Sequence, residues 1–351
     1  MYPFRGSTGL VHDRWYIAAF ASEVTRTPLE RTILGKPVVM YRTEAGAAVA
    51  MYGLCPHRYY PLALGKLEGD AIVCGYHGFT FAADGKCIRI PAQDSGAGFC
   101  QPTYRIEERG PLCWIWMGQP ERCDPALIPP YDDFGLDQPG WRNGTEYLLH
   151  LHGRAQLLVD NLMDLTHLPY IHHHIPGGDV FKKTPMVAEE RERSYRLRRL
   201  SKSPWTGFFD LLYGAGHRFE GLCEMESLTD FYGPELIRTT GPVVTAIDGA
   251  SGVPAAIGQV NFIHGITPET ETTTHYWALI TRNHRLDDPA LDGLLTEMDR
   301  HVRQQDVEAI AAVEARVDRG AAFQRELLAK SDAPAVKVRQ KIQALIDAEA
   351  S

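Results

Sequence analysis

The stretch CPHRYYPLALG at residues 55–65, followed by CGYHG at residues 74–78, decides what this chain must fold around. Each segment carries one cysteine and one histidine close together, beside the Gly and Pro residues that are typical of tight turns. Cys55, His57, Cys74 and His77 can together close around a metal centre. The sequence therefore predicts two turns held side by side, and leaves open which metal lies between them.

Zinc and a two-iron cluster are the alternatives for these four ligands. Zinc sites usually pair like ligands within a turn, whereas each turn here mixes one thiolate with one imidazole. Mixed turns fit a cluster in which one iron keeps both thiolates and the other keeps both imidazoles, the Rieske arrangement. Neutral imidazoles remove negative charge from such a cluster and raise its reduction potential. We therefore favour a Rieske [2Fe-2S] cluster that passes electrons on.

The composition of the chain excludes several classes of protein. With 351 residues, 44% hydrophobic and 23% charged, the chain is globular, and its formal net charge of -8 argues against binding nucleic acid. The N-terminal MYPFRGSTGL lacks the apolar run of a signal peptide, and no window is long enough to span a bilayer. We therefore expect a cytoplasmic protein without a membrane partner.

Two domains follow from the pattern of strands and helices. Short β-branched and aromatic runs between residues 10 and 120 predict an antiparallel β domain, and a Pro-rich link near 125–140 ends it. A helical segment at 154–172, strands to about 285 and an amphipathic helix from about 287 to 318 follow. We predict an α+β protein with domains at 1–130 and 131–351, the second a curved sheet wrapped around the long helix.

The motifs CPHR, PLALG and CGYHG resemble those of the oxygenase (α) component of Rieske non-haem iron oxygenases. The resemblance covers nearly the whole chain and is greatest to the vanillate O-demethylase, dicamba O-demethylase and toluenesulfonate methyl-monooxygenase group. It implies a Rieske domain followed by a helix-grip (START/Bet v 1-like) catalytic domain with a curved antiparallel sheet. Tyr59 and Tyr60 depart from the group, which usually has small residues there.

The segment DNLMDLTHLPYIHHH at 160–174 predicts a second metal site. Two histidines and one carboxylate with open positions on one face form the site used for Fe(II) oxygen chemistry. His167 and His172 lie five residues apart, which places them about 140° apart on an ideal helix, so the helix must distort. Pro169 lies between them and predicts the place of distortion. We interpret His173 and His174 as loop residues.

The third iron ligand must come from another segment. Asp306 and Asp299 both fall near the apolar stripe of the long C-terminal helix, where an unpaired carboxylate is costly, and periodicity does not choose between them. The family resemblance implies Asp306, together with His167 and His172, as the ligands of the mononuclear iron. It also implies that Asp164 bridges a ligand histidine to the Rieske His77 of the next subunit in a head-to-tail homotrimer. Asn161 is a candidate for a weaker role beside the iron.

The resemblance implies a terminal oxygenase that uses O2 and electrons from a separate NAD(P)H-dependent reductase. The chain has no dinucleotide-binding or plant-type ferredoxin motif of its own. The implied reaction is O-demethylation of an aromatic acid with formaldehyde release; hydroxylation of an aryl methyl group, ring dihydroxylation, and a non-enzymatic electron carrier or ligand-binding module are alternatives. His264 matches a substrate-contacting histidine of the dicamba enzyme and Arg218 an arginine common to the group. Both are candidate substrate residues.

Overall fold

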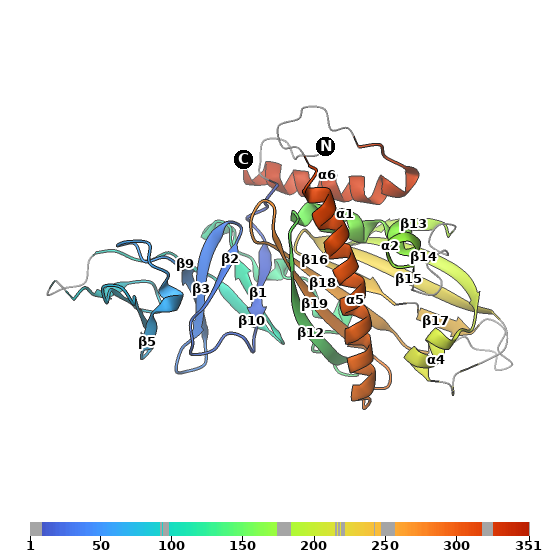
Figure 1. Cartoon of the computed structure of the whole chain (residues 1–351), viewed down its shortest axis with the longest axis horizontal. Coiled ribbons are helices and arrows are strands. Elements are labelled where there is room, and N and C mark those ends of the chain that lie inside the picture. Colours follow the sequence, from blue (N-terminus) through green and yellow to red (C-terminus); the bar gives the residue numbers. More distant parts are fainter. Residues whose placement is uncertain are drawn as a thin grey trace. The chain divides into compact units, whose positions relative to one another are not determined.

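The computed structural model describes residues 9–91, 93, 98–173, 184–214, 216, 218, 222–241, 243–246, 257–317 and 326–350 (Figure 1). It divides into two compact units. The N-terminal unit comprises Leu10–Ile128 with Thr267–Glu271, and the C-terminal unit comprises Pro129–Ile266 with Thr272–Ser351.

Three small antiparallel sheets form the described part of the N-terminal unit. Short 3-10 turns connect them to one another and to the chain that follows. In sheet order the strands are β1 Trp15–Phe20, β11 Leu112–Trp116 and β10 Ile106–Arg109; β2 Leu29–Ile33, β3 Lys36–Arg42, β4 Ala48–Tyr52 and β9 Thr103–Tyr104; β5 Lys66–Glu68, β6 Ala71–Val73, β7 Thr80–Phe81 and β8 Cys87–Arg89. The turns are η1 Leu62–Leu64, η2 Pro120–Arg122 and η3 Pro125–Leu127.

Two apolar cores hold these sheets together. The aromatic strands β1 and β11 are buried along their whole length, and Trp15 packs edge-on against Trp116. The other core lies under the β5–β8 sheet and includes both Cys55 and Cys74 among its buried residues. The two cysteines are therefore set in the packed interior of the sheet, which fixes their positions before any metal binds.

One large antiparallel sheet dominates the C-terminal unit, with eight strands in the described residues. Their order is β12 Arg142–Leu151, β19 Thr274–Arg282, β18 Val260–Pro268, β16 Leu236–Thr240, β15 Leu222–Gly233, β14 Tyr195–Pro204 and β13 Met186–Glu190, with β17 Val243–Ala246 also paired to β15. The helical elements are η4 Tyr131–Phe134, α1 Ala155–Met163, η5 Leu165–His167, α2 Leu168–Ile171, α4 Gly207–Tyr213, α5 Pro289–Glu314, η7 Lys330–Asp332 and α6 Ala333–Glu349. The predicted α+β class, with a long helix on a large antiparallel sheet, is confirmed.

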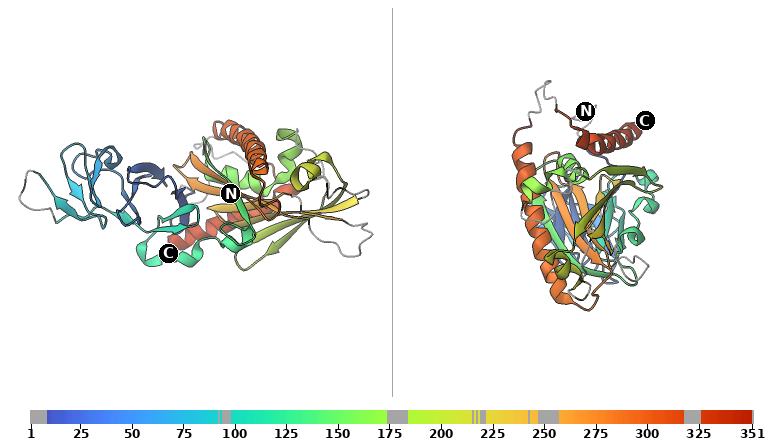
Figure 2. Two further views of the ribbon diagram at one scale, coloured as in Figure 1. Left: turned by 90° about the horizontal axis from the view of Figure 1, so that it is seen from below. Right: turned by 90° about the vertical axis from the view of Figure 1, so that its right-hand side faces the viewer.

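Helix α5 runs along one face of the sheet, as the three views show (Figures 1 and 2). Asp288 caps its first turn by accepting from the Leu291 N–H at 3.2 Å, and Pro289 occupies the first helical position, where its missing N–H costs nothing. The helix ends at Glu314, a few residues before the predicted 318. In the apolar stripe predicted for this helix, Leu291 is buried, whereas Val313, one residue before the end of the helix, is 49% exposed.

The predicted helix at 154–172 is broken, but at a different place from the one expected. Helix α1 ends at Asp164, whose backbone is extended (φ -123°, ψ 100°), and η5 and α2 follow with a new direction. Pro169 lies in the first turn of α2, where proline is tolerated, so it does not cause the break. None of the helices in the described part of the chain is both long and apolar enough to span a bilayer.

Helix α6 is an element that the sequence analysis did not predict. It packs on α1, and its Arg339 donates to Asp160 of α1 at 2.6 Å and also pairs with Glu326. Gln156 donates to the same Asp160 carboxylate at 2.7 Å. Burial raises the pKa of Asp160, and the arginine opposes that shift. The ion pair therefore ties the C-terminal helix to the helix that leads to the predicted iron ligands.

A buried polar cluster supports the middle of the large sheet. Asp230 on β15 is fully buried and accepts from Arg196 on β14 at 2.7 Å and from Arg238 on β16. Arg238 also donates to Asn261 at 3.1 Å, and Asn261 donates to the Phe134 carbonyl at 2.9 Å. The cluster connects five segments of the unit, namely β14, β15, β16, β18 and η4, so the loss of Asp230 should affect all of them.

We predict that Asp230→Ala lowers the free energy of unfolding of the C-terminal unit by about 3–5 kcal/mol, because it leaves two guanidinium groups without their buried counter-charge. Urea denaturation measures the change. The control is Lys337→Ala, whose ion pair with Glu190 is exposed and should contribute less than about 1 kcal/mol. Equal, small losses in both variants would contradict this role for Asp230.

Candidate metal centres

The two cysteine–histidine turns share one backbone hydrogen-bond pattern. The N–H of Cys55 donates to the carbonyl of Tyr60 at 2.9 Å, and the N–H of Cys74 donates to the carbonyl of Phe79 at 2.8 Å, five residues on in each case. The N–H of Tyr59 donates back to the carbonyl of Cys55, and the N–H of Gly78 donates back to the carbonyl of Cys74. Two copies of one turn therefore present one cysteine and one histidine each, as the sequence motif predicted.

The repeated turn explains why Tyr59 is an unusual residue. It has a φ of 54°, the left-handed conformation that Gly78 takes (φ 71°) at the same place in the other turn. Glycine adopts this conformation without steric cost, whereas a bulky aromatic residue does so rarely. The Tyr59 side chain is 72% exposed. This chain therefore replaces the expected small residue with an exposed ring at the edge of the turn.

The four ligands form two pairs. Cys55 and Cys74 are buried, and desolvation raises the pKa of the Cys55 thiol to about 11, with a further increase from the adjacent Cys74. The rings of His57 and His77 are exposed and lie 4.5 Å apart, at 69° to each other. A bound cation would favour the thiolate form of Cys55, which burial disfavours.

The way in which the cysteines and histidines pair helps to distinguish a single zinc ion from a two-iron cluster. Cys55 and Cys74 are both buried, whereas the His57 and His77 rings are both exposed and contact each other. Like ligands therefore lie together in space, although each turn mixes one cysteine with one histidine. Two separate pairs fit two irons, one with thiolates and one with imidazoles.

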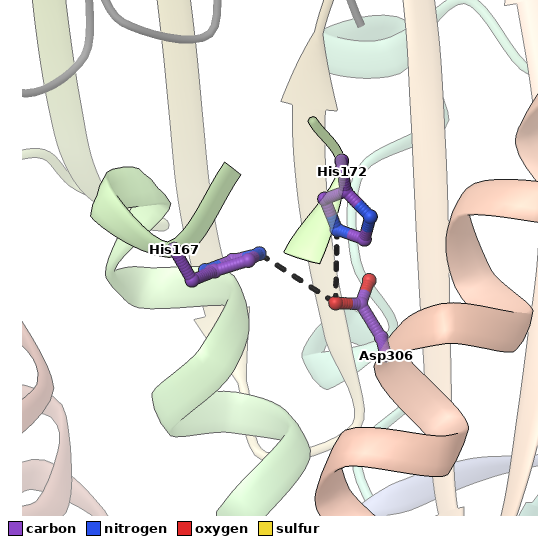
Figure 3. Close-up of side chains that lie close together, drawn as sticks. All are labelled: His167, His172 and Asp306. Carbon is purple, nitrogen blue, oxygen red and sulfur yellow. Dashed lines mark hydrogen bonds and ion pairs between the residues drawn. The ribbon is translucent and has the colours of Figure 1, made fainter. Parts of the chain in front are cut away.

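The second site brings together three residues from distant parts of the sequence (Figure 3). His172 Nε2 lies 3.1 Å from Asp306 Oδ1, and His167 Nε2 lies 3.5 Å from the same oxygen. The two imidazole rings are 5.3 Å apart and inclined at 75°. All three donor atoms therefore point at one small volume, and two imidazoles with one carboxylate leave further coordination positions for O2.

The backbone explains how residues five positions apart can face one point. The break at Asp164 and the short η5 turn place His167 before α2, and His172 caps the end of α2 with a non-helical backbone (φ -106°, ψ 44°). Asp306 comes from α5 and is buried. The other acid in the α5 stripe, Asp299, is already bonded to Arg303 at 2.8 Å and Tyr147 at 2.7 Å. Asp306 is thus the carboxylate that faces the histidines.

Each histidine of this site is oriented through its other ring nitrogen. His167 Nδ1 lies 2.6 Å from the backbone carbonyl of Asp164, and His172 Nδ1 lies 2.9 Å from Gln305 Oε1. Both acceptors fix the tautomer with the proton on Nδ1 and leave Nε2 free to bind a metal. Gln305 was missed in the sequence analysis; its position directly before Asp306 was the available signal.

The charges in the site favour a bound cation. Burial lowers the pKa of His167. Burial also opposes protonation of His172, but the hydrogen bond and the charge of Asp306, together with the hydrogen bond to Gln305, raise the pKa of His172. Asn161 donates to Asp306 Oδ1 at 3.1 Å, while its own Oδ1 is buried without a hydrogen-bond partner. A metal ion would neutralise Asp306, replace the proton on His172 and give Asn161 a charged neighbour.

The structure places the remaining predicted residues as follows. The Asp164 carboxylate accepts from the Thr166 N–H at 2.9 Å and so caps η5. His264 is buried, with both ring nitrogens bonded: to Tyr276 Oη at 2.6 Å and to Thr239 Oγ1 at 3.0 Å.

Arg218 is 64% exposed and pairs with Asp210 at 3.4 Å. His173 is exposed at the end of α2, and His174 lies outside the described residues.

Comparisons with known proteins agree with this geometry. Residues 14–105 match the Rieske [2Fe-2S] domain, and residues 151–348 match the vanillate O-demethylase oxygenase C-terminal domain. The dicamba O-demethylase oxygenase component of Stenotrophomonas maltophilia is 30% identical over 97% of this chain and 99% of its own. A putative toluene-4-sulfonate monooxygenase iron-sulfur subunit of Comamonas testosteroni is 38% identical over 80% of this chain and 82% of its own.

A solved structure has the same fold. The crystal structure of dicamba monooxygenase bound to 3,6-dichlorosalicylic acid superposes with a TM-score of 0.86 at 28% identity, covering 97% of this chain and 99% of that one. The chain therefore belongs to the vanillate O-demethylase-type oxygenase components of the Rieske non-haem iron oxygenases. It is a Rieske monooxygenase component whose cofactors are a [2Fe-2S] cluster and a mononuclear iron.

We predict that Gln305→Leu weakens iron binding at the mononuclear site by about 10- to 100-fold, because His172 loses the acceptor that orients its ring. Iron content after dialysis against a graded chelator series measures the loss. Gln304→Leu is the matched control, since Gln304 is exposed on α5 and bonds to Glu308. Iron retention that is equal in both variants would show that Gln305 does not position His172.

Proposed function

We propose that this oxygenase component removes the methyl group from a methoxy substituent of an aromatic acid. One oxygen atom of O2 enters a methyl C–H bond and the other leaves as water, with two electrons and two protons consumed. The product is a hemiacetal that breaks down to formaldehyde and a phenol. The observation that carries the proposal is the His167, His172 and Asp306 group in the same chain as the paired cysteine–histidine turns.

In this proposal, Cys55, His57, Cys74 and His77 hold the cluster, and His167, His172 and Asp306 hold the iron. When bound, the iron supplies the site at which O2 is reduced beside the substrate. Asp306 balances the charge of the ion, and Asn161 holds the Asp306 carboxylate in place through its amide N–H. We also propose that the two functions divide between domains at residues 1–130 and 131–351.

Electrons enter from a separate NAD(P)H-dependent reductase, because oxygenase components of this family work in multicomponent systems. We propose that they cross between subunits of a homotrimer, from the cluster of one chain to the iron of its neighbour. Asp164 would form the hydrogen-bonded connection between the two centres. Its backbone carbonyl already contacts His167, and its carboxylate belongs to the same residue. A chain in the cytoplasm would meet such a reductase directly.

The substrate class rests on charge and on the named relatives. Arg199 on β14 is a buried cation. Burial lowers its pKa, and the negative charge of Asp164 raises it. Arg199 therefore lies near the segment that carries the iron ligands. A cation at this position suits a carboxylate or sulfonate on the substrate. We retain His264 and Arg218 as candidate substrate residues. For His264, contact requires the imidazole to exchange one of its two present partners for a substrate oxygen.

The test is oxygen uptake with formaldehyde detection. Purified protein is combined with NADH, a surrogate vanillate-type reductase and a panel of methoxybenzoates and methylbenzoates. The proposal expects formaldehyde in a ratio of about one to the oxygen consumed with at least one methoxybenzoate. Oxygen consumption with no formaldehyde from any methoxylated compound would contradict O-demethylation.

Hydroxylation of an aryl methyl group is the second candidate. The toluene-4-sulfonate monooxygenase subunit named above is more similar to this chain, at 38% identity, than the dicamba O-demethylase at 30%. The same two metal sites would serve this reaction, because both insert one oxygen atom into a methyl C–H bond. A benzyl alcohol product from a methylbenzoate or toluenesulfonate, without formaldehyde, would favour it.

We predict that Asp164→Asn retains both metal centres but lowers turnover by about 10- to 100-fold. The amide oxygen of asparagine can still cap η5 by accepting from Thr166, so the local fold should remain. The single-turnover rate of cluster oxidation after mixing the reduced protein with O2 and substrate measures the effect. A wild-type rate in this variant would mean that Asp164 does not connect the cluster and the iron.

A further inference from the structure

A group of histidines lies outside both iron centres, on the edge of the large sheet. The side chain of His150, the penultimate residue of β12, projects from one face of the strand, and His152 lies in the bend that follows the end of the strand at Leu151. His275 on β19 pairs directly with His150 across the two strands and therefore shares that face. The strand register brings His150 and His275 together, and the bend after β12 places a third imidazole, that of His152, beside them.

The spacing of the first two rings matches that of the iron-binding pairs in this chain. The rings of His150 and His152 lie 4.7 Å apart and are inclined at 84°. The corresponding values are 5.3 Å and 75° for His167 and His172, and 4.5 Å and 69° for His57 and His77. The distance between His150 and His152 falls between the two, so the two rings are close enough for one nitrogen of each to reach a single metal ion.

The surroundings of the pair combine access with support. His150 and His152 are both exposed, so a metal ion can reach them from solvent. His275 is 7% exposed, and its ring lies 6.1 Å from that of His150. Behind it, the ring of the fully buried Trp277 lies 6.3 Å from His275. The exposed pair therefore lies next to the buried imidazole of His275, which is itself next to the buried indole of Trp277.

We propose that His150 and His152 form a third metal site, which binds one divalent transition-metal ion such as Ni²⁺, Zn²⁺ or Cu²⁺. Two neutral imidazoles supply the protein ligands, and water fills the remaining positions. Imidazole nitrogens select these ions over Mg²⁺ and Ca²⁺, which prefer oxygen ligands. His275 lies farther away than the spacing within either iron-binding pair, so it flanks the site as the third imidazole of the group.

Isothermal titration of the untagged, iron-loaded full chain with NiCl2 tests the site. The proposal expects about one Ni²⁺ bound per chain, and at least a tenfold weaker affinity in His152→Asn, because one of two ligands is lost. His301→Asn is the matched control: this histidine is exposed on α5 and should leave the titration unchanged. Circular dichroism without metal checks that both variants are folded.

Iron is measured before and after the titration to show where nickel binds. Unchanged iron with about one nickel per chain supports a separate site. Nickel uptake matched by loss of iron would place the nickel in an iron centre and overturn the proposal. Absence of nickel binding to the wild-type chain, or equal affinity in the wild type and His152→Asn, would overturn it as well.

Discussion

The burial of Asp306 between two imidazoles is the constraint on which the C-terminal unit depends. A carboxylate that is 4% exposed is costly unless a cation or several donors compensate it. The chain supplies one amide donor, from Asn161, and the nitrogens of His167 and His172. A metal ion bound by these three side chains would complete the compensation, so the buried carboxylate and the proposed iron belong to one design.

Holding these groups together requires the surrounding helices to be fixed. Helix α5 is anchored by Arg303, which bonds to Asp299 one turn along and to the backbone carbonyl of Ile263 on β18. On the opposite side, Arg339 of α6 ties down Asp160, which directly precedes Asn161. Two ion pairs, Arg303–Asp299 and Arg339–Asp160, therefore support the elements that carry the site. They connect the helices that carry Asp306 and Asn161 to the rest of the unit.

Local spacing made part of the site predictable. The cysteine–histidine turns and the two histidines near Pro169 are encoded within short segments, so the sequence was sufficient to identify them. Helical periodicity did not choose Asp306 over Asp299, because both acids lie on the stripe of α5. The family resemblance implied Asp306, and the structure gives the physical reason: Asp299 is already bonded to Arg303 on α5 and to Tyr147 on β12. Gln305 and α6 were missed for the same reason: their roles depend on contacts with residues more than a hundred positions away.

The central claim is that one chain holds two kinds of iron centre. Total iron and acid-labile sulfide per chain, measured in the wild type and in Asp306→Ala, test it most directly. We expect about three irons and two sulfides in the wild type, and about two irons with unchanged sulfide in the variant, because the cluster ligands lie in the N-terminal unit. Three irons retained in Asp306→Ala, or only two in the fully loaded wild type, would contradict the assignment of the mononuclear site.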